Sequence, residues 1–142
     1  MIRTLQAQQG VTVLVSTHYL EEAQGVCDRV AIIDQGTIIA LDTPARLIAD
    51  LGQHVLDLGV GADPGPVLAI LQQAPHGLGE PMRTGSTVSV PSSLPAPDLT
   101  DLAGRLDLAA AGATTISIRP ATLNDVFLHL TSAARSRAEA AA

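Results

Sequence analysis

The sequence predicts a mixed α/β chain. An α/β segment over residues 1–51 is followed by a domain of β-α-β-β-α-β order over 52–134, which ends in a helix, and by a flexible tail over 135–142. Three observations support this fold class. Apolar residues make up 46% of the chain, enough to build a core. Val11–Ser16 is a continuous apolar and β-branched run, typical of a strand buried on both faces. His54–Val60 and Thr114–Arg119 alternate with period 2, as half-buried strands do.

The first 51 residues divide into short elements with clear end signals. The expected order is helix 2–9, strand 11–16, helix 17–27, strands 29–34 and 37–41, and helix 44–51. Gly10 suits the left-handed position that closes the first helix. Asp34-Gln35-Gly36 predicts a hairpin turn between the two strands. Thr43 as N-cap, Pro44 at the first helical position and Gly52 beyond the end frame the last helix.

The pattern restarts after Gly52, which is therefore the predicted domain boundary. Strand 54–60 is followed by a helix opened by Pro64, a hairpin over 80–90 turning at Gly85-Ser86, and a Pro/Ser-rich connector over 91–97. A helix over 98–111 ended by Gly112, a strand over 114–119 and a helix opened by a Thr122–Asp125 capping box complete the domain, with fraying expected beyond Ala133. This order is that of a ferredoxin-like domain, in which right-handed crossovers bring both helices to one face of a four-stranded antiparallel sheet.

Composition excludes several kinds of function. The net charge of −6 and the two aromatic residues, Tyr19 and Phe127, argue against nucleic-acid binding by phosphate contacts or base stacking. Cys27 is the single cysteine, so an intrachain disulfide is impossible and a small buried hydrophobe is the expected role. Gln6, Gln8, Gln9 and Gly10 interrupt any signal-peptide core, and no apolar run approaches the ~20 residues that span a bilayer. A cytoplasmic protein is expected.

His18 follows the predicted strand 11–16 and precedes a helix with Glu21 and Glu22 in its first turn. Ligands of parallel α/β sheets sit beyond the carboxyl ends of the strands, so this is a favourable place for a functional group. The position alone also fits a histidine satisfied by a backbone carbonyl in a turn. Both interpretations stay open on these residues.

The neighbouring residues resemble the switch-histidine region of ABC-transporter ATP-binding subunits over roughly Ile2 to Leu51. In that family a strand leads into S/T-H, then an acidic helix, then D-R-[IV]-x-[VI]-[ILM]-x-x-G. The matching residues are Ser16, Thr17, His18, Glu21, Glu22, Asp28, Arg29, Val30, Ile32, Ile33 and Gly36. The run Arg119–Thr131, RPATLNDVFLHLT, resembles the ending of daunorubicin/doxorubicin-resistance drug exporters, close to P-[ST]-L-[ED]-D-V-F-L-x-L-T. Such subunits carry an extra C-terminal domain.

The resemblance implies a C-terminal remnant of an ABC nucleotide-binding domain over 1–51, with the extra domain over 52–134. His18 would be the switch histidine, which contacts the ATP γ-phosphate in a complete domain, where catalysis is mainly placement and charge stabilisation. The family uses ATP and Mg²⁺, a permease subunit and a second ATP-binding subunit, at the inner face of the membrane. The eight basic residues here are all arginines, so no P-loop G-x-x-x-x-G-K-[ST] can exist in this chain. We therefore expect a fragment with no cofactor of its own and no ATPase activity alone; whether it counts as an enzyme is left open.

Weaker candidates have structural explanations. Glu21 and Glu22 fit solvated first-turn residues, and Asp28 and Arg29 fit a turn or an ion pair. His54, His76 and His129 lack metal-ligand spacing and are expected to be surface or packing residues. The alternative function is a small ferredoxin-like dimerisation or effector-binding module without catalytic activity, an analogy of fold alone. A standalone enzyme with His18 as general base would lack a nucleophile, a metal site and a phosphate loop.

Overall fold

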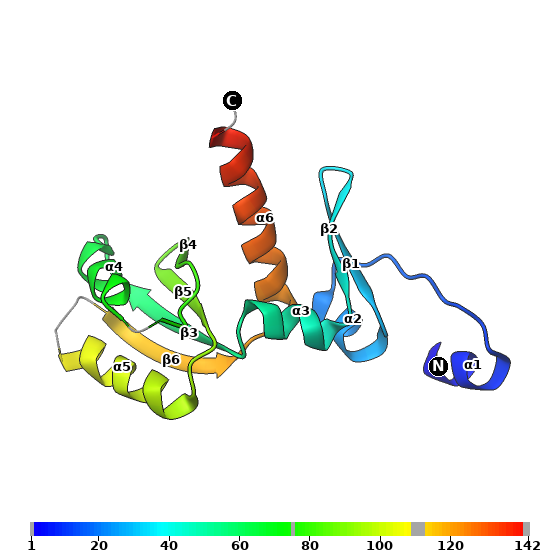
Figure 1. The fold of residues 1–142 in the computed structure, drawn as a ribbon, viewed down its shortest axis with the longest axis horizontal. Helices are drawn as coiled ribbons and strands as arrows, with labels where there is room; N and C mark the ends of the chain where they lie inside the picture. The colour runs from blue at the N-terminus through cyan, green and yellow to red at the C-terminus, as the bar shows by residue number, and fades with distance from the viewer. Residues whose placement is uncertain (1, 75, 109–112, 141–142) are drawn as a thin grey trace. The chain divides into compact units, whose positions relative to one another are not determined.

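The computed structural model describes residues 2–74, 76–108 and 113–140 (Figure 1). Its elements are α1 (Ile2–Gln9), α2 (Leu20–Val26), β1 (Val30–Asp34), β2 (Thr37–Asp42), α3 (Pro44–Leu51), β3 (His54–Val60), α4 (Gly65–Gln72), β4 (Met82–Thr84), β5 (Thr87–Ser92), α5 (Ala96–Leu108), β6 (Ala113–Pro120) and α6 (Leu123–Ala140). The chain forms two compact units. Unit 1 comprises residues 1–47 and 122–142, and unit 2 comprises residues 48–121.

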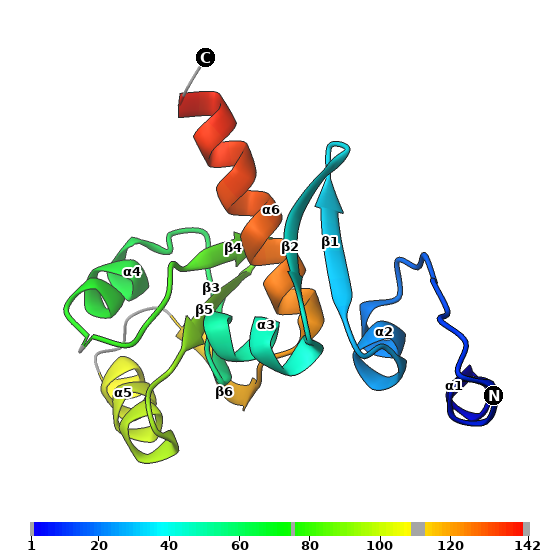
Figure 2. The same cartoon turned by 45° about the vertical axis from the view of Figure 1, so that its right-hand side comes forward.

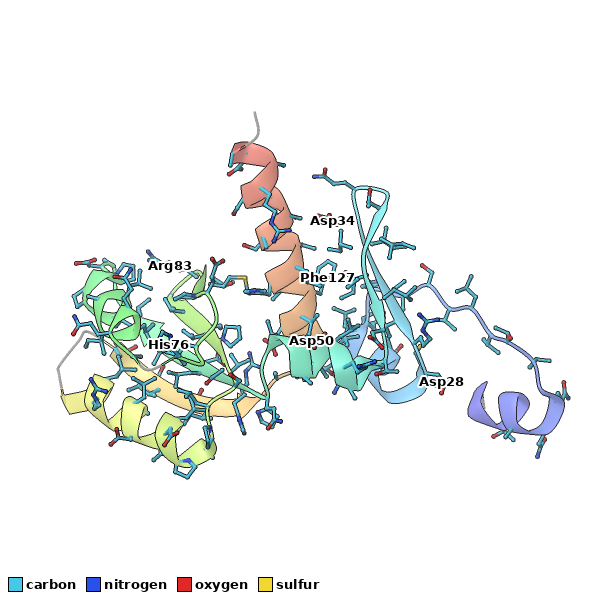
Figure 3. All side chains as sticks on the ribbon, viewed as in Figure 1. Asp28, Asp34, Asp50, His76, Arg83 and Phe127 are labelled. Atoms are coloured by element: carbon cyan, nitrogen blue, oxygen red, sulfur yellow. The ribbon has the colours of Figure 1, made fainter. Side chains whose placement is uncertain are left out.

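Unit 1 is built around an antiparallel hairpin of β1 and β2 (Figure 1). Asp34 pairs with Thr37, and the two residues between them, Gln35 and Gly36, have φ of 48° and 79°. Positive φ at both central positions is the geometry of a type I′ turn, whose twist matches that of the strands it joins. The predicted hairpin is therefore confirmed, with Asp34 at its tip as labelled in Figure 3.

The predicted buried strand over Val11–Ser16 is wrong for this structure. No helix or strand is assigned to residues 11–16, and Leu14 is 98% exposed. A strand buried on both faces needs neighbouring strands that satisfy its backbone and cover its side chains. Neither sheet in the described part of the chain includes this segment, since one contains β1 and β2 and the other contains β3 to β6. The segment is also preceded by the expected helix, α1, which Gly10 closes at φ 60°.

We predict that amide hydrogens of Val13 to Val15 exchange much faster than those of β3. These N–H groups are not paired with a neighbouring strand, so little protects them from exchange with solvent. The N–H groups of β3, in contrast, lie in a strand that is paired on both sides. Hydrogen–deuterium exchange followed by mass spectrometry measures both segments in one sample. More broadly, residues 53–132 should form the more protected part and residues 1–50 the less protected part. Strong protection of Val13 to Val15 in monomeric protein would contradict this.

The unit 1 helices begin where the sequence predicts, with one exception. Thr43 Oγ1 accepts the Arg46 N–H at 3.3 Å, which confirms Thr43 as the N-cap of α3. Helix α2 begins at Leu20 rather than Thr17, because Tyr19 N–H is bound by the Thr17 hydroxyl at 3.0 Å and the chain is bent there.

Helix α6 begins at the predicted capping box. Thr122 N–H and Oγ1–H both donate to Asp125 Oδ2 at 2.8 Å. The predicted apolar stripe is buried at Leu123 and Val126 and half-buried at Phe127 and Leu130. The helix continues past Ala133 to Ala140, since alanine, arginine and glutamate are strong helix formers. Residues 135–140 of the predicted flexible tail are thus helical, and 141–142 lie outside the described residues.

Unit 2 contains a four-stranded antiparallel sheet in the order β4-β5-β3-β6. Strand β3 occupies an inner position, with Leu58 opposite Val88 on β5 and Ile116 on β6. Alternation places Leu56, Leu58 and Val60 on one face of β3, as predicted. The hairpin of β4 and β5 turns at Gly85, whose φ is 61°, which confirms the predicted turn.

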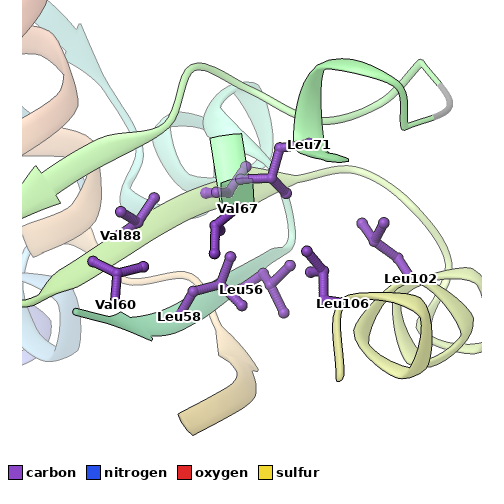
Figure 4. Packing of buried hydrophobic residues seen from close by; sticks show 9 residues of the cluster. Leu56, Leu58, Val60, Val67, Leu71, Val88, Leu102 and Leu106 are labelled. Atoms are coloured by element: carbon purple, nitrogen blue, oxygen red, sulfur yellow. The ribbon is translucent and has the colours of Figure 1, made fainter. Parts of the chain in front are cut away.

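The core of unit 2 lies between one face of this sheet and helices α4 and α5 (Figure 4). Its buried members are Leu56, Leu58, Val60, Val67, Leu71, Val88, Val90, Leu102 and Leu106. Both helices contribute to one cluster, so both cover the same face of the sheet. The opposite face carries the other half of the alternation, including Asp57, Ser89 and Ser117.

The predicted connector over 91–97 is shorter in the structure. Pro91 and Ser92 extend β5, and α5 begins at Ala96. Proline is tolerated at position 91 because its nitrogen lies on the side of β5 away from β3, where the Pro91 carbonyl accepts the Gly79 N–H at 2.7 Å. The predicted helix end at Gly112 lies outside the described residues.

Within the described ranges, none of the helices is both long enough and apolar enough to cross a membrane.

Candidate functional site

His18 lies on a bend directly before α2 and is exposed to solvent. Its ring lies against that of Tyr19, with centroids 4.1 Å apart and planes tilted by 36°. Tyr19 occupies the N-cap position, and its carbonyl accepts the Ala23 N–H at 3.3 Å, the first hydrogen bond of the helix. The imidazole therefore lies exposed at the start of a helix, in contact with the ring of its neighbour.

The acidic residues of α2 do not converge with His18 on a metal site. Glu21 and Glu22 are exposed in the first turn, as the sequence predicts, where negative charge suits the helix dipole. Among the described residues, no three His, Cys, Asp or Glu side chains are grouped as metal ligands. Asp28, labelled in Figure 3, and Arg29 are exposed in a bend before β1, which fits their predicted role in a turn.

Helix α2 packs against α6, which follows it by about a hundred residues in the chain. Gln24 Oε1 accepts the N–H of Leu123, the first residue of α6, at 3.0 Å. Ala23, next to Gln24, is only 6% exposed. Sequence reasoning found the capping box of α6 but not this contact, because nothing local to Gln24 indicates a partner that distant.

A second polar group lies in unit 2, on the face of the sheet opposite α4 and α5. Asp57 Oδ2 accepts the Arg119 Nε–H at 2.6 Å, and Asp57 Oδ1 accepts the Ser89 hydroxyl at 2.6 Å. The three residues come from the adjacent strands β5, β3 and β6. Both carboxylate oxygens of Asp57 therefore have a hydrogen-bond partner on a neighbouring strand. These bonds stabilise the pairing of the three strands, which is a structural role. Asp57 interrupts an apolar run in the sequence, and this charged residue within a strand is the signal that could have indicated the interaction.

Of the remaining histidines, His54 and His76 belong to unit 2 and His129 to unit 1. His54 is half-buried at the start of β3, and its Nδ1 is buried without a hydrogen-bond partner. His76, labelled in Figure 3, is exposed, and His129 is half-buried on α6. Cys27 is a half-buried free thiol at the end of α2.

Comparison with known proteins gives relatives over most of the chain. The Nod factor export ATP-binding protein I of Mesorhizobium japonicum is 34% identical over 131 residues, which are 92% of this chain and 35% of the relative. The daunorubicin resistance ATP-binding proteins DrrA2 and DrrA3 of Streptomyces coeruleorubidus are each 36% identical, over 86% and 93% of this chain. This chain spans 38% and 42% of those two proteins. No protein-family model matches the chain.

These relatives confirm the resemblance drawn from His18 and from the Arg119–Thr131 run. Over about nine tenths of its own length, the chain is homologous to the ATP-binding proteins of ABC-type daunorubicin-resistance and Nod factor export systems, and it spans about two fifths of theirs.

Proposed function

We propose that the chain is the C-terminal part of the ATP-binding subunit of an ABC-type export transporter. The observation that supports this most is the 34–36% identity to drug-resistance and Nod factor export ATP-binding proteins over about 90% of the chain. A permease subunit and a second ATP-binding subunit would be its partners, at the cytoplasmic side of the membrane. A homodimer of this chain alone is the competing assembly.

We also propose that residues 1–51 are the end of a nucleotide-binding domain and residues 52–134 a ferredoxin-like domain. The strand order β4-β5-β3-β6, antiparallel throughout, supports the second assignment. The shared core of α4 and α5 on one face supports it further.

ATP with Mg²⁺ is the cofactor that the family implies, and the residues present do not form a site for it by themselves. The chain contains no lysine, so it has no P-loop lysine for the β- and γ-phosphates. The described residues offer no cluster of metal ligands, and His18 is exposed, with its ring against that of Tyr19. We propose that His18 contacts the γ-phosphate only in a complete domain, and that this chain alone does not hydrolyse ATP.

Two linked experiments test this proposal. Calorimetric titration of the chain with ATP and Mg²⁺ should give no saturable binding. A chimera should then be made in which the preceding three fifths of the Streptomyces DrrA2 relative are joined to this chain at the aligned position. The chimera should hydrolyse ATP, and His18→Ala should lower its rate about 100-fold or more, because an imidazole aimed at developing charge is lost.

His76→Ala in the same chimera is the matched control, since His76 is an exposed histidine of unit 2, and it should leave the rate within about twofold. Tight Mg²⁺-dependent ATP binding by the chain alone would refute the fragment interpretation. Equal rates for the His18 and His76 variants of an active chimera would refute the role of His18.

A further inference from the structure

Helices α2 and α6 belong to opposite ends of the chain but to the same compact unit. Figure 2 shows α2 shortly after the N-terminal segment and α6 running to the C-terminus. The two helices pack together, and Gln24 Oε1 accepts the Leu123 N–H at 3.0 Å. A side chain of one helix therefore caps the first amide of the other.

The donor of this hydrogen bond, the Leu123 N–H, belongs to a residue that is not accessible to water. The first N–H groups of any α-helix have no acceptor within the helix. The Asp125 carboxylate accepts a hydrogen bond from the Thr122 N–H, and the Val126 N–H donates to the Thr122 carbonyl at 3.3 Å. Leu123 is completely buried, so its N–H depends on the acceptor that Gln24 supplies.

Helix α2 depends on such contacts for its orientation. It has only seven residues, and helices this short are not stable in water without tertiary packing. His18 and Tyr19 immediately precede it, and the Tyr19 carbonyl makes its first hydrogen bond. A shift of α2 therefore moves the imidazole, whose ring lies on that of Tyr19.

The chain enters α6 directly from unit 2. Strand β6 ends at Pro120 and α6 begins at Leu123, so two residues join them. Ala121 N–H is held by the Gln53 carbonyl at 3.0 Å within unit 2, and Thr122 is held by Asp125 within α6. Both linking residues are therefore hydrogen-bonded, each within its own unit.

We propose that Gln24 is a positioning residue that couples the histidine-bearing helix α2 to α6. Through this contact, a displacement at the start of α6 reorients His18. The consequence for ATP chemistry rests on the proposed function, whereas the coupling itself is a property of this chain. Gln24 acts through α2 and touches no reacting atom.

Nuclear magnetic resonance of the labelled full chain tests the coupling. Gln24→Leu keeps a similar size but removes the acceptor. It should raise amide exchange at Leu123 at least 10-fold and shift the His18 ring and Tyr19 amide resonances. Gln24→Glu keeps an acceptor and places negative charge near the start of α6, so it should restore Leu123 protection and leave the His18 resonances near those of the parent.

Glu22→Gln is the matched control on α2, since Glu22 is exposed, and it should change neither Leu123 exchange nor the His18 ring. Amides of β3 should be unaffected in all variants, which separates the coupling from a general loss of stability. Thr122→Ala perturbs the start of α6 without changing α2, because it removes the hydroxyl that donates to Asp125. It should shift His18 when Gln24 is present and have less effect in the Gln24→Leu background.

Two results would overturn the proposal. Unchanged Leu123 exchange in Gln24→Leu would mean that the contact does not protect this amide. Faster Leu123 exchange with unchanged His18 resonances, in both Gln24→Leu and Thr122→Ala, would mean that α6 does not orient the histidine. None of these readouts uses ATP, so failure of the coupling leaves the proposed function standing, and an inactive chimera leaves the coupling standing.

Discussion

Gly52→Ala should destabilise unit 2 by about 3 kcal/mol, among the largest effects of any substitution to alanine in this chain. Gly52 has φ 138°, a conformation that side-chain-bearing residues rarely adopt. A Cβ built there would lie 2.8 Å from both the carbonyl carbon and oxygen of Ser92. These are backbone atoms at the end of β5, where Ser92 pairs with His54, so they cannot move without breaking the sheet.

The effect should be measured by urea denaturation followed by circular dichroism, together with amide exchange of β3. Fluorescence is unsuitable, because the sequence has no tryptophan and its tyrosine and phenylalanine, Tyr19 and Phe127, both lie in unit 1. Gly61→Ala is the matched control: its φ is ordinary and a Cβ there meets nothing within 4 Å. The control should change stability by less than about 0.5 kcal/mol. Equal midpoints for the two variants would show that the close approach to Ser92 is not a constraint.

Leu58→Ala should cost about 3 kcal/mol, within the usual range of 2 to 5 for leucine in a packed core. Leu58 is completely buried in the cluster formed by β3, β5, α4 and α5 (Figure 4). Its neighbours across the sheet are Val88 and Ile116, and the two helices close the cluster above it. Removing its side chain loses apolar contacts and leaves a cavity that residues from four elements would have to fill.

Ile118→Ala is the control for this variant. Ile118 also lies in the unit 2 sheet, opposite Leu56, but it is 37% exposed on the edge strand β6. Its truncation removes less buried area and should cost about 1 kcal/mol or less. Both variants can be compared by the same urea titration. A Leu58→Ala midpoint equal to that of Ile118→Ala would place Leu58 outside the cooperative core.

Local patterns in the sequence were sufficient to predict most of the helices, strands and turns. Gly10, Gly36 and Gly85 all have the positive φ that their predicted turns or helix end require. The alternation of Leu56, Leu58 and Val60 predicted both β3 and its buried face. These signals work because turn geometry, capping and side-chain periodicity are determined within a few residues.

The sequence was misleading where structure depends on distant partners. Val11–Ser16 has the composition of a buried strand, yet a strand forms only when other strands supply its hydrogen bonds. The Gln24–Leu123 contact and the Asp57–Arg119 pair join residues far apart in sequence, which periodicity cannot reveal. The same holds for the candidate site. The sequence predicted that His18 precedes a helix, but it did not reveal the contact of His18 with the Tyr19 ring or the hydrogen bond between that helix and α6.

The division of the chain into units has a consequence for biosynthesis. Unit 2 is one continuous stretch, residues 48–121, whereas unit 1 needs residues 1–47 together with 122–142. A ribosome delivers the chain from its N-terminal side, so all of unit 2 is made before α6 is. Unit 1 must wait until α6 has been made, with its buried apolar residues Leu123 and Val126. Until then α2 lacks its packing partner α6, and this is the interval in which a chaperone would be most needed.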